Sequence, residues 1–190
     1  MFTKFTEGGP YTKPLHIDET NHTLLPPRAD GAFRQVQLFV YLIDVTEPIG
    51  ATRVVSRTQT RDIPADQLWF DRAGQVVLDE HEVSAEGGAG SVLAYAADTV
   101  HRGAAMTEPG GRRVFANLGF QPAAADWIGD RPWPRRAGDR RVTRWIETLD
   151  LRQLMALGFP PPGHAYWDEQ TLAATARRYP ALDLAPFATA

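Results

Sequence analysis

Up to about residue 121, the apolar residues of this 190-residue chain occur only in short runs bounded by glycine, proline and polar turns. The clearest run is 36–45 (VQLFVYLIDV), which is rich in β-branched and aromatic residues and predicts a strand. The turn signal at 47–50 (EPIG) separates it from a second strand at 51–55. Further strands are expected at 76–78, 91–95 and 114–120. Many short strands joined by loops predict a sandwich, a jelly roll or a barrel.

After residue 121 the pattern changes from strands to helices. Apolar residues at helical spacing over 142–157 predict two short helices broken near Asp150, and 169–178 predicts a last short helix. The length suits one domain. We therefore expect a β core over residues 1–125, followed by an Arg-, Pro- and Trp-containing segment and a helical C-terminal extension over 126–190 of the same domain.

The composition excludes several classes of function. Without cysteine, the chain cannot form disulfides, thiolate zinc sites or cysteine nucleophiles, so a transition-metal site must use carboxylates and the five histidines. The formal net charge of −3 gives no reason to expect nucleic acid or an anionic membrane as partner. No apolar run approaches the roughly 20 residues that span a bilayer, and the N-terminus lacks the apolar core of a signal peptide. We therefore predict a cytoplasmic protein that acts on a small molecule.

His16 and Asp18 form the first part of a predicted metal site. Residues two apart on a strand point to the same face, so this imidazole and carboxylate can bind one ion as neighbours. Two histidines and one carboxylate on one face of an octahedron leave open positions, as in non-haem Fe(II) oxygenases. The His-x-Asp spacing alone also fits a surface histidine near the N-terminus.

The third ligand must come from a distant strand, and His101 is the best candidate. It lies just after the predicted strand at 91–95. Taken alone, such a histidine could equally be a capping or buried residue.

An arginine pair begins the predicted strand that follows. Arg112 shares a face with Val114, Ala116 and Leu118, whereas Arg113 shares the other face with Phe115 and Asn117. The more apolar face is expected to point inward, and it carries Arg112. A buried guanidinium needs an anionic partner, either a protein carboxylate or a dicarboxylate ligand.

Over residues 15–121 these features together resemble the phytanoyl-CoA dioxygenase family. The resemblance rests on the His16–Asp18 pair, on His101 as the distal histidine, and on Arg112 following it 11 positions later, with Arg113 as the near alternative. Two further segments are similar to family motifs, YLIDVTEPIGATRVV at 41–55 and GSVLAY at 90–95.

The resemblance implies a mainly β protein with a double-stranded β-helix (a cupin-like jelly roll). It also implies Fe(II) held by His16, Asp18 and His101, with 2-oxoglutarate and O₂ as co-substrates. Arg112, or Arg113, would pair with the far carboxylate of 2-oxoglutarate.

The implied reaction releases succinate and CO₂ and hydroxylates a small organic substrate, such as a lipid-like acid, a thioester or a natural-product intermediate. Related halogenases carry a small residue in place of Asp18, so hydroxylation is favoured over halogenation.

The sequence departs from the family before His16, which only 15 residues precede. This leaves three alternatives: the sequence is a fragment, its start is misplaced, or it is a reduced form whose missing strands come from a second copy of the chain or from a partner chain. The alternative prediction is a cupin-type β-barrel, or a partner-dependent module, that binds a metal or a ligand without oxygenase turnover.

Overall fold

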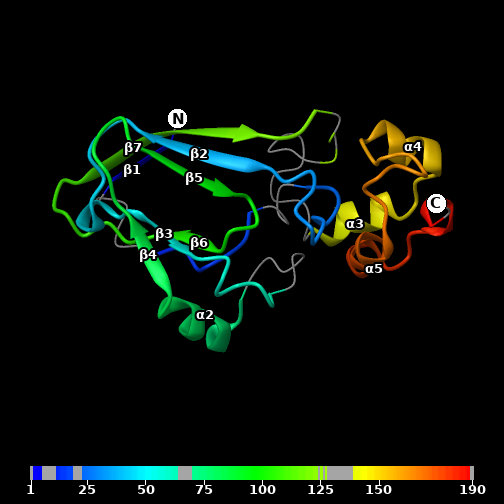
Figure 1. Cartoon of the computed structure of the whole chain (residues 1–190), viewed down its shortest axis with the longest axis horizontal. Coiled ribbons are helices and arrows are strands. Elements are labelled where there is room, and N and C mark those ends of the chain that lie inside the picture. Colours follow the sequence, from blue (N-terminus) through cyan, green and yellow to red (C-terminus); the bar gives the residue numbers. More distant parts are fainter. Residues whose placement is uncertain are drawn as a thin grey trace. The chain divides into compact units, whose positions relative to one another are not determined.

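Figure 1 shows a computed structural model of the whole chain. The structure describes residues 2–5, 12–18, 23–63, 70–123, 125, 127 and 139–188. Contacts group them into two compact units. The first unit takes in the described residues up to Ile17, 36–63 and 70–120, and the second takes in the others.

The first unit contains a four-stranded antiparallel sheet in the order β1-β7-β2-β5. Its strands are β1 (Phe2–Phe5), β2 (Val36–Tyr41), β5 (Val92–Ala96) and β7 (Arg112–Phe120). The predicted strands at 36–45, 91–95 and 114–120 are thus confirmed, with shifted ends. In the register, Phe39 of β2 lies between Leu93 of β5 and Asn117 of β7.

A second antiparallel sheet has the order β4-β3-β6. It is formed by β3 (Thr52–Val55), β4 (Glu82–Ala85) and β6 (His101–Gly103). The chain around His16 extends this sheet beyond β6. The His16 amide donates to the His101 carbonyl over 3.1 Å, and the His101 amide donates back over 3.0 Å. This pairing joins residues 85 positions apart and creates the candidate site.

The interior of the first unit is aromatic and aliphatic. One buried cluster combines residues of the four-stranded sheet with two residues of the connection from β2 to β3: Phe39, Tyr41, Val45, Ala51, Tyr95 and Phe115. A second comprises Leu15, Ile17, Val55, Leu78 and Val100. The other face of the four-stranded sheet is also apolar, with exposed side chains at Val36, Val92, Leu118 and Phe120. Both faces of these strands are therefore rich in apolar residues.

Between β3 and β4 lies the helix α2 (Arg72–Asp79), where the sequence predicted a strand at 76–78. That prediction is wrong. The side chain of Asp71 caps the helix by accepting a hydrogen bond from the Gly74 amide. Only Leu78 is buried, while Val76 and Val77 are exposed. Three adjacent apolar residues fit one turn of helix as well as a strand, so their pattern could not decide between the two.

The second unit is helical in its described C-terminal part (Figure 1). The helices are α3 (Arg140–Ile146), α4 (Leu151–Ala156) and α5 (Glu169–Arg178), followed by the 3₁₀ turn η3 (Ala185–Phe187). The predicted break near Asp150 is confirmed, because Asp150 is the N-cap of α4. The predicted helix at 169–178 is α5. Buried aromatic residues such as Trp127, Tyr166 and Phe187 form the core of this unit.

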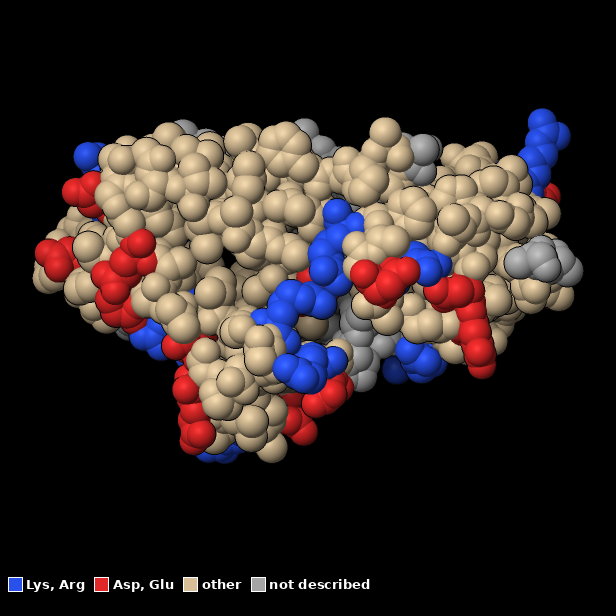
Figure 2. Space-filling model, viewed as in Figure 1, with Lys and Arg blue, Asp and Glu red and all other residues tan. Residues whose placement is uncertain are grey.

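No helix in the described residues is long and apolar enough to cross a membrane. Acidic and basic side chains are interspersed over the face drawn in Figure 2.

Candidate metal centre

The three residues predicted to bind a metal come together in the structure. His16, Asp18 and His101 each offer one ligand atom, and these atoms lie within 4.8 Å of one another. The two imidazole rings have their centroids 4.5 Å apart. The backbone pairing of His16 with His101 produces this proximity, and Asp18 follows two positions after His16. Both histidines are buried and Asp18 is half-buried.

Both histidines are oriented by the same kind of contact. The Nδ1 atom of His16 lies 2.9 Å from the carbonyl oxygen of Pro14. The Nδ1 atom of His101 lies 2.9 Å from the carbonyl oxygen of Thr99. A carbonyl only accepts, so each Nδ1 carries the hydrogen and each Nε2 keeps its lone pair. Such a contact fixes the tautomer and ring orientation of a metal-ligating histidine.

The donor set suits a divalent first-row metal. Two imidazole nitrogens and one carboxylate oxygen form the 2-His-1-carboxylate set of non-haem Fe(II) sites, which leaves positions for other ligands. The same three groups could also hold zinc.

The predicted orientation of the two arginines is reversed in the structure. Arg112 is exposed, whereas Arg113 is buried at 8% exposure. The prediction that Arg112 points inward is therefore wrong. It assumed that the more apolar face of β7 lies inside, but Val114, Ala116 and Leu118 lie on the outer face. The inner face of β7 carries Arg113 beside Phe115.

Arg113 contacts two neutral groups, the Gly50 carbonyl and the Phe115 ring. Among the described residues, no Asp or Glu forms an ion pair with Arg113. Its Nη1 donates to the carbonyl oxygen of Gly50, and its guanidinium carbon lies 5.3 Å from the centre of the Phe115 ring. The buried Nε has no hydrogen-bond partner in the described structure. Burial lowers the pKa of Arg113 because the charged form loses its hydration.

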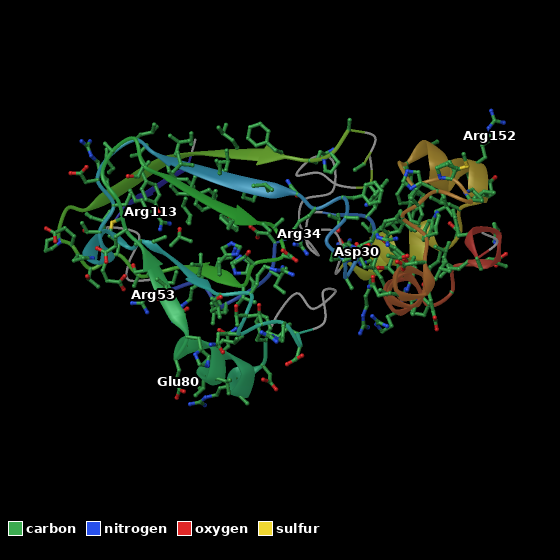
Figure 3. The ribbon with its side chains drawn as sticks, viewed as in Figure 1. Asp30, Arg34, Arg53, Glu80, Arg113 and Arg152 are labelled. Carbon is green, nitrogen blue, oxygen red and sulfur yellow. The ribbon has the colours of Figure 1, made fainter. Side chains whose placement is uncertain are left out.

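A row of rings joins Arg113 to the candidate metal ligands. The ring centroids of His101 and Tyr95 are 4.9 Å apart, those of Tyr95 and Phe39 are 5.3 Å apart, and those of Phe39 and Phe115 are 4.4 Å apart. Phe115 in turn packs under Arg113. Figure 3 shows the labelled Arg113 side chain among the strands of the first unit. His101 and Arg113 are therefore connected through packed aromatic rings of the first unit.

Sequence reasoning missed one cation near the candidate metal ligands, Lys13. The Nζ atom of Lys13 lies 2.6 Å from Nε2 of His16, the atom available to a metal. The side-chain oxygens of Gln37 and Asn117 are buried and have no hydrogen-bond partner in the described structure. A lysine three positions before His16 carries no recognisable pattern, because the chain between them follows no regular strand geometry.

No protein-family model matches the chain, and no curated protein does. Among solved structures, it is similar to the epimerase SnoN in complex with Fe³⁺, alpha-ketoglutarate and nogalamycin RO, with 21% identity and a TM-score of 0.45 over 60% of this chain and 44% of that one. It is also similar to a putative oxidoreductase from Salmonella typhimurium LT2, with 18% identity and a TM-score of 0.39 over 73% of this chain and 41% of that one.

The chain thus spans less than half the length of these two structures. TM-scores below 0.5 and identities near 20% do not establish a family for it.

Proposed function

We propose that this chain is an Fe(II)- and 2-oxoglutarate-dependent dioxygenase that hydroxylates a small organic substrate and releases succinate and CO₂. The observation that carries the proposal is the pairing of two sites in one interior. One is a His-Asp-His set with both Nε2 atoms oriented by backbone carbonyls. The other is a buried arginine that forms no ion pair with any carboxylate of the described residues. A keto acid with a second carboxylate satisfies both sites at once.

The proposed roles follow from the position of each side chain. His16, Asp18 and His101 would hold Fe(II), which in this class of enzyme supplies the activation of O₂ coupled to decarboxylation of the keto acid. Arg113, and not Arg112, would bind the far carboxylate, because only Arg113 is buried. Tyr95, Phe39 and Phe115 would keep water from the space between these groups.

The sheet order supports a double-stranded β-helix as the proposed fold. The chain around His16 acts as one more strand beside β6, so four segments would face the four strands of the other sheet. Asp18 supports hydroxylation over halogenation, since a small residue there would open a halide position.

Uncoupled turnover tests the proposal before a substrate is known. The purified chain, supplied with Fe(II), O₂ and 2-oxoglutarate, is expected to form succinate slowly. His101→Ala should abolish this product, because it removes one ligand. His81→Ala is the matched control, because His81 is exposed on the turn after α2. If the wild type forms no succinate while binding Fe(II), the chain is a metal-binding module of the cupin type.

A further inference from the structure

Two carboxamide side chains lie on the inner face of the four-stranded sheet. Gln37 of β2 is buried at 2% exposure, and Asn117 of β7 is half-buried. Phe39, two positions after Gln37 and on the same face of β2, lies directly opposite Asn117 in the register. Residues directly opposite each other in an antiparallel pair share a face, so the two carboxamides are diagonal neighbours, with backbones about 7–8 Å apart.

Gln37 lies next to the candidate metal centre. It is directly opposite Tyr95 of β5, so the Cβ atoms of these two residues are about 4.5–5.5 Å apart on the inner face. The ring of Tyr95 packs against that of His101, with centroids 4.9 Å apart. The partner of Gln37 on β7 is Gly119, which has no side chain. One aromatic residue therefore separates the Gln37 carboxamide from a candidate metal ligand.

Each carboxamide has an unused acceptor. The side-chain oxygens of Gln37 and Asn117 are buried, and neither has a hydrogen-bond partner among the described residues. A buried acceptor without a partner destabilises a protein, and native proteins contain few of them. Gln75 shows the contrasting structural case, because it accepts from the Leu15 amide and donates to the Leu15 carbonyl. Two unpaired acceptors near the candidate metal centre indicate a ligand that donates hydrogen bonds to them.

The chemistry of the carboxamides selects the class of this ligand. A carboxamide is uncharged, accepts through its oxygen and donates through its nitrogen. A carboxylate has no hydrogen to give to the unpaired oxygens, and a hydrocarbon would leave them unpaired. A cation would be repelled by a bound metal and by Arg113, which shares its face of β7 with Asn117. A hydroxyl group is neutral and both donates and accepts, so it fits best.

We infer that the substrate is a neutral, hydroxyl-bearing molecule, and that Gln37 and Asn117 bind its hydroxyl groups beside the metal. As a statement about the substrate, this inference rests on the proposed function. It narrows the substrate from any small organic molecule to an alcohol or polyol. Gln37 and Asn117 are then specificity-determining residues of the same site.

Ligand-observed NMR tests this class with matched pairs of small probes. Methyl glucopyranoside and anhydroerythritol are compared with methoxytetrahydropyran and tetrahydrofuran, which have the same rings without hydroxyl groups. Saturation transfer from the purified, metal-free chain should reach the hydroxylated probes and not their parent rings. Gln37→Met keeps the length of the side chain and removes the acceptor, so it should raise the Kd of the hydroxylated probes by about 10-fold. Asn117→Leu should change it in the same direction.

Stability provides a second measurement that needs no ligand. Gln37→Met removes an unpaired buried acceptor and should raise the Tm of the ligand-free chain by about 2–4 °C. Gln75→Met is the matched control. It breaks two hydrogen bonds with Leu15, so it should lower the Tm and leave the binding of the probes unchanged. If Gln37 had only a structural role, both variants would be less stable than the wild type.

Each other outcome also decides the matter. If the hydroxylated probes bind no better than their parent rings, or if neither kind binds, the inference is refuted. If Gln37→Met leaves the probes unaffected and weakens 2-oxoglutarate at the Co(II)-loaded chain, Gln37 serves the co-substrate, which also refutes it. The probes are titrated without metal, so a failure of the proposed function is seen separately. Wild-type protein that binds Fe(II) and the hydroxylated probes but forms no succinate would retain this binding site without the oxygenase reaction.

Discussion

Arg113 should make the ligand-free protein less stable than it would be with an apolar side chain. A buried charge without a compensating partner costs about 3–5 kcal/mol. The hydrogen bond from Arg113 to the Gly50 carbonyl offsets about 1.5–3 kcal/mol. The contact with the Phe115 ring offsets about 0.5–1 kcal/mol more. The mid-range values leave a net cost of about 1 kcal/mol, so Arg113→Met should raise the free energy of unfolding by about that amount.

Thermal denaturation at neutral pH measures this effect. For a chain of this size, 1 kcal/mol corresponds to a rise in Tm of roughly 2–4 °C. With Fe(II) and 2-oxoglutarate present under anaerobic conditions, the wild type should instead have a higher Tm than Arg113→Met. At a ligand concentration of 100 times its Kd, the wild type gains about 2.7 kcal/mol, and the variant, which binds more weakly, gains less.

Arg112, the exposed neighbour of Arg113, provides the control for this prediction. Arg112→Met should change the unfolding free energy by no more than about 0.5 kcal/mol in either condition. A ligand-free Arg113→Met protein that is less stable than the wild type would refute the reasoning, because Arg113 would then contribute to folding without any bound anion. Equal stabilisation of both proteins by 2-oxoglutarate would refute its role in binding.

Two further predictions concern stability. Gly50 has φ +77°, and a Cβ atom there would lie 2.9 Å from the Ala104 carbonyl oxygen, whereas Gly90 has φ +87° and nothing within 4 Å of such an atom. Gly50→Ala should therefore lower the urea midpoint of unfolding more than Gly90→Ala. Equal effects of the two substitutions would contradict the close contact at Gly50. Burial raises the pKa of Tyr166, so its stabilising effect is present below the unfolded pKa of about 10 and is lost as pH rises above it. Tyr166→Phe should therefore lose less stability than the wild type between pH 8 and 11, and identical losses in urea titrations would contradict this.

The strands and helices that the sequence predicted are those with a clear local pattern. The run VQLFVYLIDV contains β2, and the segment 142–157, predicted from the spacing of its apolar residues, overlaps α3 and contains α4. The strands β1, β4 and β6 were missed, because strands of three or four residues depend on partners far away in the chain. Helix α2 was misread because its apolar run is as short as a strand.

The candidate site was predictable in part. The resemblance brought His16, Asp18 and His101 together, and the structure places their ligand atoms near one another. The choice between Arg112 and Arg113 failed for a physical reason. Interior faces are normally the more apolar ones, but here the interior of β7 carries Arg113 and Asn117, while its outer face is apolar. Lys13 could not be found from sequence, because its proximity to His16 depends on a segment that follows no regular secondary structure.

The most direct test of the central claim is an anaerobic titration of the purified chain with Fe(II) and 2-oxoglutarate, followed by visible spectroscopy. The account predicts an iron–keto-acid charge-transfer band that is absent in His16→Ala and needs more 2-oxoglutarate in Arg113→Met, with Arg112→Met behaving as the wild type. Folded wild-type protein that binds Fe(II) and gives no such band would contradict it.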